Sequence, residues 1–129
     1  MNSELLMSSS HNPRAQGTHA EDEALRFYLD RHRSRLVTRN YYSRSGEIDL
    51  VFEDKTLRGP ELVFVEVKSR KAHSLVAAID CLSPAKKRRL TRAIQHYLAR
   101  YRGPAQTMRV DLLAQDGGEW AHIKSIALL

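Results

Sequence analysis

The chain has 129 residues, of which 42% are hydrophobic, enough for one domain with a hydrophobic core. Its single cysteine, Cys81, excludes an intramolecular disulfide and fits a reducing compartment. No apolar run is long enough to span a bilayer, and residues 1–16 lack the features of a secretion signal. We expect a soluble cytoplasmic protein without a membrane partner, with a disordered tail over residues 1–16 and a single domain over residues 17–129.

The formal net charge of +6 is concentrated in one segment. Residues 84–102 contain seven basic residues and no acidic ones, whereas the rest of the chain has 14 basic and 15 acidic residues. A local basic patch is what a polyanion would contact, although a solvated helix face explains the same charges equally well. The residues predicted to bind nucleic acid are Arg70, Lys71, Lys86, Lys87, Arg88, Arg89 and Arg92.

The first predicted helix runs from about Thr18 to about His32. Thr18 fits the N-cap position, and Glu21 has the spacing of its capping-box partner. The expected apolar face comprises Ala20, Ala24, Leu25, Phe27, Tyr28 and Leu29. A strand over residues 35–44, rich in Val, Thr and Tyr, should follow.

Two further strands are predicted over residues 46–52 and 61–70, joined by a hairpin loop over residues 53–60. The first alternates in hydrophobicity, as a strand does. The second, ELVFVEVKSR, is apolar on both faces of its centre except at Glu66, which is typical of a central strand.

The second half of the chain predicts a short helical piece over residues 75–82 and a longer helix from Pro84 to about Tyr101, with Ser83 as its N-cap. The expected buried stripe of the longer helix comprises Leu90, Ile94, Tyr97, Leu98 and Tyr101. A strand over residues 107–114 and a short last strand over residues 122–127 complete the order. This order predicts an α/β fold with a central mixed sheet flanked by helices.

Chemistry is indicated by Glu66, because a carboxylate in an apolar strand costs several kcal/mol unless it is paired or binds a cation. Lys68 lies on the same strand face, and Glu47 and Asp49 share a face of the neighbouring strand. If the two strands form a hairpin, Asp49 and Glu66 converge. Two carboxylates about 4 Å apart repel by about 4 kcal/mol, which a shared proton or a cation relieves.

Carboxylate ligands of this kind suit Mg²⁺ or Mn²⁺, so Asp49, Glu66 and Glu47 are the predicted metal ligands. With Lys68 beside the metal, such a site supports phosphodiester hydrolysis. The alternative from the residues alone is a structural ion pair between Glu66 and Lys68, with both acids of the neighbouring strand solvated.

Several stretches of the chain together resemble one family. They are residues 17–29, Arg39-Asn40, Gly46–Leu50 (GEIDL), Val63–Arg70 (VFVEVKSR), Lys87–Leu90 with Tyr97-Leu98, and Arg109–Asp111. They resemble the YraN-like family of uncharacterised bacterial proteins (uncharacterised protein family 0102), which look like PD-(D/E)XK nucleases. The resemblance covers about Gly17 to Leu113.

The resemblance implies a restriction-endonuclease-like three-layer fold. Asp49 would be the D of the motif, Glu66-Val67-Lys68 the ExK, and Glu21 an accessory acid of the catalytic site. Two features depart from the family pattern: Val110 replaces the usual aromatic residue, and the Phe-Gly-Pro type of sequence is absent after Arg70.

Three functions are consistent with these observations. The first is a metal-dependent DNA endonuclease, the second a non-catalytic nucleic-acid-binding protein on a nuclease-like scaffold, and the third an accessory subunit whose site a partner completes. No base-reading element is visible, so we expect recognition of nucleic-acid shape over sequence. Many DNA-cutting enzymes are dimers, and we therefore also consider a homodimer. Arg109 and Asp111 share a strand face, where a structural salt bridge is expected, with phosphate contact by Arg109 as the alternative.

Overall fold

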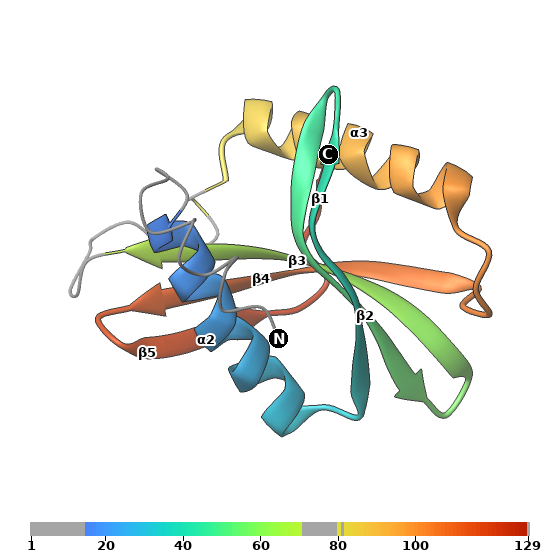
Figure 1. Cartoon of the computed structure of the whole chain (residues 1–129), viewed down its shortest axis with the longest axis horizontal. Coiled ribbons are helices and arrows are strands. Elements are labelled where there is room, and N and C mark those ends of the chain that lie inside the picture. Colours follow the sequence, from blue (N-terminus) through green and yellow to red (C-terminus); the bar gives the residue numbers. More distant parts are fainter. Residues whose placement is uncertain (1–14, 71–79, 81, 129) are drawn as a thin grey trace.

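The computed structural model describes residues 15–70, 80 and 82–128. Within this part of the chain, two helices and five strands follow in the order α2 (Ala15–Arg31), β1 (Ser34–Ser43), β2 (Gly46–Thr56), β3 (Gly59–Arg70), α3 (Pro84–Arg100), β4 (Thr107–Asp116) and β5 (Glu119–Ile123). The strands form one sheet in the order β1-β2-β3-β4-β5 (Figure 1).

The sheet is mixed. Its neighbouring strands run antiparallel except β3 and β4, which are parallel. Parallel neighbours need a crossover connection, and the segment that contains α3 makes it. β3 therefore lies in the centre of the sheet, as its two-sided apolar sequence predicts.

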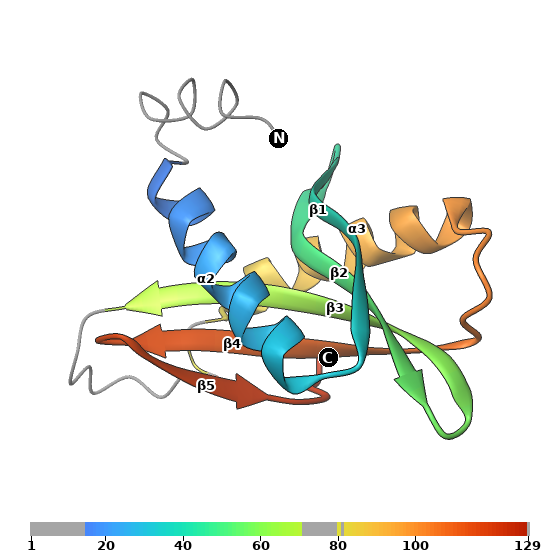
Figure 2. The same cartoon turned by 60° about the horizontal axis from the view of Figure 1, so that its bottom comes forward.

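The two helices cover opposite faces of the sheet, which gives three layers (Figure 2). The buried core beneath α3 contains Ile48, Val51, Leu62, Phe64, Leu90, Ala93, Ile94 and Val110. The buried core beneath α2 contains Ala24, Tyr28, Leu50, Phe52, Val63, Val65 and Leu113. The predicted α/β class, with a mixed sheet flanked by helices, is confirmed. Its assignment as restriction-endonuclease-like stays a prediction.

Helix α2 begins at Ala15, so Thr18 lies within the helix and the predicted capping box is wrong. The predicted cap of α3 is confirmed, because the Ser83 hydroxyl accepts a hydrogen bond from the Lys86 N–H at 3.2 Å. Leu29 and Leu98, which the apolar periodicity places on buried faces, are 39% and 37% exposed. They lie at the edges of their apolar stripes, where the curvature of a helix leaves side chains in water.

The predicted eight-residue loop between β2 and β3 is also wrong, because the strands continue to a two-residue turn at Leu57-Arg58. Gly59, with φ of +107°, permits this turn. The last strand lies over residues 119–123 instead of 122–127, because Gly117 and Gly118 reverse the chain directly after β4.

The predicted short helix over residues 75–82 and the tail over residues 1–16 fall mostly outside the described residues. Ala15 and Gln16 belong to α2. Neither α2 nor α3 combines the length and apolar character that a membrane-crossing helix needs.

Candidate functional site

The site begins where β2 separates from β3. The two strands pair from Leu50 and Val65 to the turn, and the pairing ends before Asp49. The Asp49 carboxylate replaces the missing strand partner, because its Oδ2 accepts a hydrogen bond from the Val67 N–H at 2.8 Å. This contact fixes Asp49, which is only 8% exposed, against the strand that carries Glu66 and Lys68.

Three carboxyl groups meet around this gap. Glu66 comes from β3, Asp49 from β2, and Glu21 from α2 on the other face of the sheet. Burial and then the negative charge of Asp49 raise the pKa of Glu66 to about 8, and the same two causes raise the pKa of Glu21 to about 8. Burial also raises the pKa of Asp49, against the hydrogen bond from Val67. The site is therefore short of positive charge.

Basic side chains flank the acids on both faces. On the face of α3, the Lys68 Nζ lies 3.7 Å from the Glu66 Oε2. On the face of α2, the Arg39 Nη2 lies 2.7 Å from the Asp22 Oδ1 and 3.8 Å from the Glu21 Oε1. This Oε1 is buried and accepts no hydrogen bond from any described residue.

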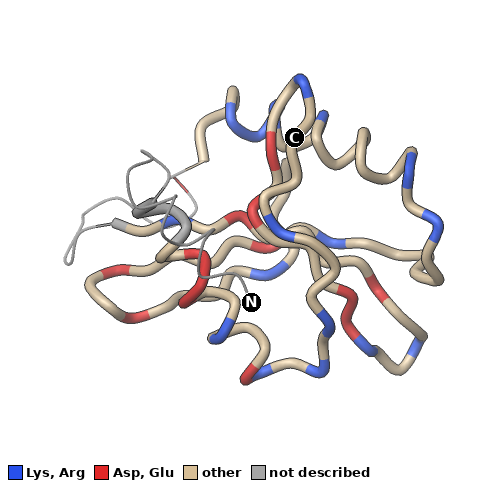
Figure 3. Tube along the Cα trace, viewed as in Figure 1, with Lys and Arg blue, Asp and Glu red and all other residues tan. Residues whose placement is uncertain are grey.

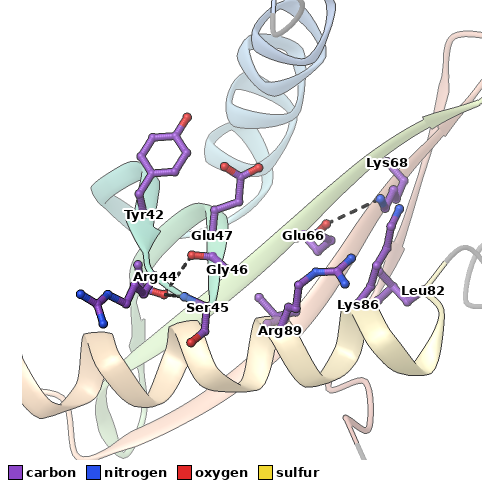
Figure 4. A pocket seen from close by; sticks show the side chains of 12 residues that line it. Tyr42, Arg44, Ser45, Gly46, Glu47, Glu66, Lys68, Leu82, Lys86 and Arg89 are labelled. Carbon is purple, nitrogen blue, oxygen red and sulfur yellow. Dashed lines mark hydrogen bonds and ion pairs between the residues drawn. The ribbon is translucent and has the colours of Figure 1, made fainter.

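Glu66 and Lys68 lie in a cavity of about 580 Å³ between the β1–β2 hairpin and α3 (Figure 4). The lining residues are Tyr42, Ser43, Arg44, Ser45, Gly46, Glu47, Glu66, Lys68, Leu82, Lys86, Arg89 and Leu90. Lys86 extends from α3 toward Lys68, while Glu47 lies across the cavity on the hairpin. Contact with Lys68 lowers the pKa of Lys86.

The predicted nucleic-acid-binding residues separate into two groups. Basic residues lie along α3, whereas acidic residues lie in the first half of α2 and near the middle of the sheet (Figure 3). Lys86 and Arg89 line the cavity, but Lys87, Arg88 and Arg92 do not. Lys71 lies outside the described residues.

The predicted metal ligands are only partly brought together. Asp49 and Glu66 are close enough for their carboxyl groups to hydrogen bond, whereas Glu47 is exposed on the wall of the cavity. Among the described residues, no group of three or more His, Cys, Asp or Glu side chains has the arrangement of a metal site. For a metal ion, the described residues therefore provide the two carboxylates of Asp49 and Glu66. The Glu21 carboxyl group approaches them from the other face of the sheet.

Sequence reasoning missed Arg39 as a charge partner of the acids, and Tyr42 and Arg44 as residues of the cavity wall. All three belong to the β1–β2 hairpin. For Arg39 the sequence signal was the Arg39-Asn40 pair, whereas Tyr42 and Arg44 gave none, because nothing local relates the hairpin to α3, which lies far along the chain.

The predicted salt bridge between Arg109 and Asp111 is confirmed at 3.1 Å, and it belongs to a larger network. Arg109 also contacts Asp54 at 3.1 Å and Glu61 at 2.9 Å. Asp111 is fully buried, and burial alone would raise its pKa. The hydrogen bonds from His122, the Ser125 N–H and Arg109 outweigh burial and lower the pKa of Asp111. Each charged group of this network has at least one partner, which supports a structural role.

Comparison with known proteins identifies the family. The family model described as "Uncharacterised protein family UPF0102" matches residues 20–114. The chain belongs to this family. The match includes β2 and β3, and with them Asp49, Glu66 and Lys68, so the UPF0102 core is the part of the fold that carries the candidate site.

Individual UPF0102 proteins confirm this membership. The chain is 42% identical over 111 residues to one from Ralstonia nicotianae, covering 82% of each chain. It is 46% identical over 90 residues to one from Nitrosococcus oceani, covering 70% of this chain and 68% of the relative. A third, from Pseudoalteromonas translucida, is 40% identical over 112 residues, 87% of each chain. The resemblance found from the motifs is thus confirmed at the level of the family, and the link to PD-(D/E)XK nucleases stays a prediction.

Proposed function

We propose that this UPF0102 protein hydrolyses phosphodiester bonds of DNA with the help of Mg²⁺ or Mn²⁺. The observation that carries the proposal is the convergence of Asp49, Glu66 and Lys68, of which Glu66 and Lys68 line a cavity whose other wall is basic. Acidic side chains that would hold a cation and basic side chains that would hold a phosphate lie side by side there. That pairing is what an enzyme acting on a phosphodiester needs.

The acids of the site fit a hard divalent cation. The raised pKa values of Glu66 and Asp49 both indicate missing positive charge, as does the buried Glu21 Oε1, which no described residue hydrogen bonds. Mg²⁺ commonly takes one or two protein carboxylates and completes its shell with water and substrate phosphate, so two carboxylates suffice. When bound, the ion would polarise the phosphodiester and neutralise charge on the leaving oxygen.

The protein's own residues have distinct roles in this proposal. Asp49 and Glu66 hold the cation in their ionised forms, and the Val67 N–H fixes the orientation of Asp49. The Lys68 Nζ, placed by Glu66, stabilises negative charge on the phosphate and orients the attacking water. Glu21 does not contact the cation; its carboxyl group interacts with Asp49 and so influences the charge of Asp49.

A titration of Mg²⁺ and Mn²⁺ with branched, nicked, single-stranded and duplex DNA tests the proposal. We expect metal-dependent cleavage that falls at least about 100-fold in Asp49→Ala and in Lys68→Ala, while Asp49→Ala still binds DNA in EDTA. Asp30→Ala and Lys124→Ala, at exposed positions away from the cavity, are the matched controls and should cut like the wild type.

The second candidate function is nucleic-acid binding without catalysis, either alone or as an accessory subunit. It is favoured by the absence of a three-ligand cluster among the described residues. DNA binding with no cleavage of any substrate in either metal would establish binding and refute the hydrolase. Failure to bind any nucleic acid would favour a partner-dependent accessory role.

A further inference from the structure

The cavity has two walls that touch at one end. Gly46, at the base of the β1–β2 turn, packs so closely on α3 that an added Cβ would lie 2.6 Å from the Arg89 carbonyl oxygen. Backbone therefore meets backbone there, and the hairpin tip and the helix close that end of the cavity. The contact at Gly46 leaves no passage at that end for a chain molecule lying between the walls.

The chemical groups of the site are recessed: Glu66 and Lys68 line the cavity, and Asp49, beside Glu66, is buried. The Glu66 side chain is 17% exposed and Asp49 is 8% exposed, while exposed parts of the hairpin and α3 stand at the rim. A volume of about 580 Å³ is that of a pocket for one small ligand. A duplex presents its phosphates on the outside of a stiff helix, so its backbone cannot bend into such a space without losing base pairs.

The rim combines an aromatic side chain with cations. Tyr42 is 47% exposed on the hairpin and lines the cavity, and Arg44, Lys86 and Arg89 line it as well. Four lining cations, counting Lys68, face only two lining carboxylates, Glu47 and Glu66. Aromatic surfaces for base stacking beside a basic groove are how proteins bind single strands without reading their sequence.

We propose that this cavity takes one unpaired nucleotide of a single-stranded segment of nucleic acid, with its base against Tyr42 and its phosphate toward Lys68 and Lys86. The inference rests on the proposed function, because it places the phosphate beside the same acids (Figure 4). Its substrates are single strands and unpaired tails of duplexes, and fully paired DNA is excluded.

Binding in EDTA, measured by fluorescence anisotropy, separates this inference from catalysis. We expect an oligothymidylate and a duplex with an unpaired tail to bind at least about tenfold more tightly than a blunt duplex. Tyr42→Ala should weaken oligothymidylate binding at least about fivefold, the size of one base–aromatic stack, and Tyr42→Phe should retain it. Equal affinity for blunt duplex and oligothymidylate in the wild type would overturn the inference without any variant.

Lys86→Met with Lys124→Met as its control tests the phosphate contact. Both changes remove one positive charge from an exposed lysine, but only Lys86 lines the cavity. We expect a several-fold loss of oligothymidylate affinity in Lys86→Met alone, and equal losses in the two variants would overturn the placement. Circular dichroism of each variant confirms that the fold is kept.

The two proposals fail in different ways. If blunt duplex is cut in Mg²⁺ as readily as single strands in an Asp49-dependent reaction, the proposed function stands and the single-strand inference is wrong. If single strands bind through Tyr42 but no substrate is cut, the inference stands as a binding site and the hydrolase is refuted.

Discussion

At the scale of one residue, Glu66 has conflicting requirements. Folding favours its protonated form, whereas binding a cation needs its ionised form. Its carboxyl group lies in the central strand, and burial together with Asp49 raises its pKa to about 8 from a normal value of 4.5. Between these values the folded protein holds a proton that the unfolded chain has released. By linkage, the contribution of Glu66 to stability is complete below about pH 4.5 and is lost as the pH rises toward 8.

We therefore expect Glu66→Gln to change the pH dependence of stability. The amide carries no charge at any pH, so the free energy of unfolding of the variant in EDTA should exceed that of the wild type at pH 8 by more than about 1 kcal/mol. The difference should shrink toward pH 5. Urea unfolding across this range measures it, with the exposed Glu119→Gln as control. A constant difference between wild type and variant would contradict the raised pKa.

The same residue links stability to the proposed metal. A divalent cation between Asp49 and Glu66 would remove the cost of ionising both groups. The pairing of Asp49 with the Val67 N–H means that one acid is already oriented before any cation arrives. Binding energy at this site is thus not spent on placing Asp49.

At the scale of elements, the contact between the β1–β2 hairpin and α3 decides the shape of the cavity. The contact exists because residue 46 has no side chain, and the Arg89 carbonyl occupies the space where a Cβ would lie. Beneath it, Tyr41 packs on Tyr97 with ring centroids 5.1 Å apart, which anchors the hairpin to the helix.

Gly46→Ala is therefore expected to push the hairpin away from α3. We predict a loss of about 1–3 kcal/mol in the free energy of unfolding, the usual cost of overpacking, together with weaker binding of oligothymidylate. Thermal and urea unfolding measure the first effect. Ser45→Ala is the control, because the hydrogen bond of Ser45 comes from its backbone N–H and survives the change. Equal stability of Gly46→Ala and Ser45→Ala would show that the hairpin can move away from α3 without cost, which would contradict the prediction.

At the scale of the whole molecule, the excess positive charge is unevenly placed. The chain has a net charge of +6, and basic residues are concentrated on α3 (Figure 3). This helix has four consecutive basic residues, from Lys86 to Arg89. Only the first and the last of them line the cavity. The helix therefore offers a nucleic acid short-range contacts through Lys86 and Arg89. Its other basic side chains contribute a positive electrostatic potential around the cavity.

We predict that replacing Lys86, Lys87, Arg88 and Arg89 together by Ser weakens DNA binding and flattens its dependence on salt. Removing one phosphate contact reduces the slope of log affinity against log salt by roughly one, so we expect a change nearer two than four. Binding isotherms over a range of salt concentrations measure the slope. The matched control replaces four exposed basic residues outside α3 by Ser, namely Arg26, Lys55, Arg58 and Lys124. An unchanged slope would show that α3 is only a solvated face.

Local sequence predicted the parts of the fold that local physics controls. Ser83 before Pro84 determined where α3 begins, because an N-cap needs only a hydroxyl and the next turn of backbone. The apolar run of β3 determined that it is the central strand, because only burial on both faces accommodates it. The motif residues Asp49, Glu66 and Lys68 were identified from the same kind of pattern.

Tertiary structure decided the rest. Glu21 had the spacing of a capping box, yet it lies beside Asp49 and Arg39, because the start of α2 is set by where the helix packs on the sheet. The separation of β2 from β3 at Asp49, and the contact of Gly46 with Arg89, join segments that no short-range pattern relates. The sequence by itself thus determined which residues are charged and which strands are buried. Only long-range packing decided which charges share a cavity, because that depends on distances between elements far apart in the chain.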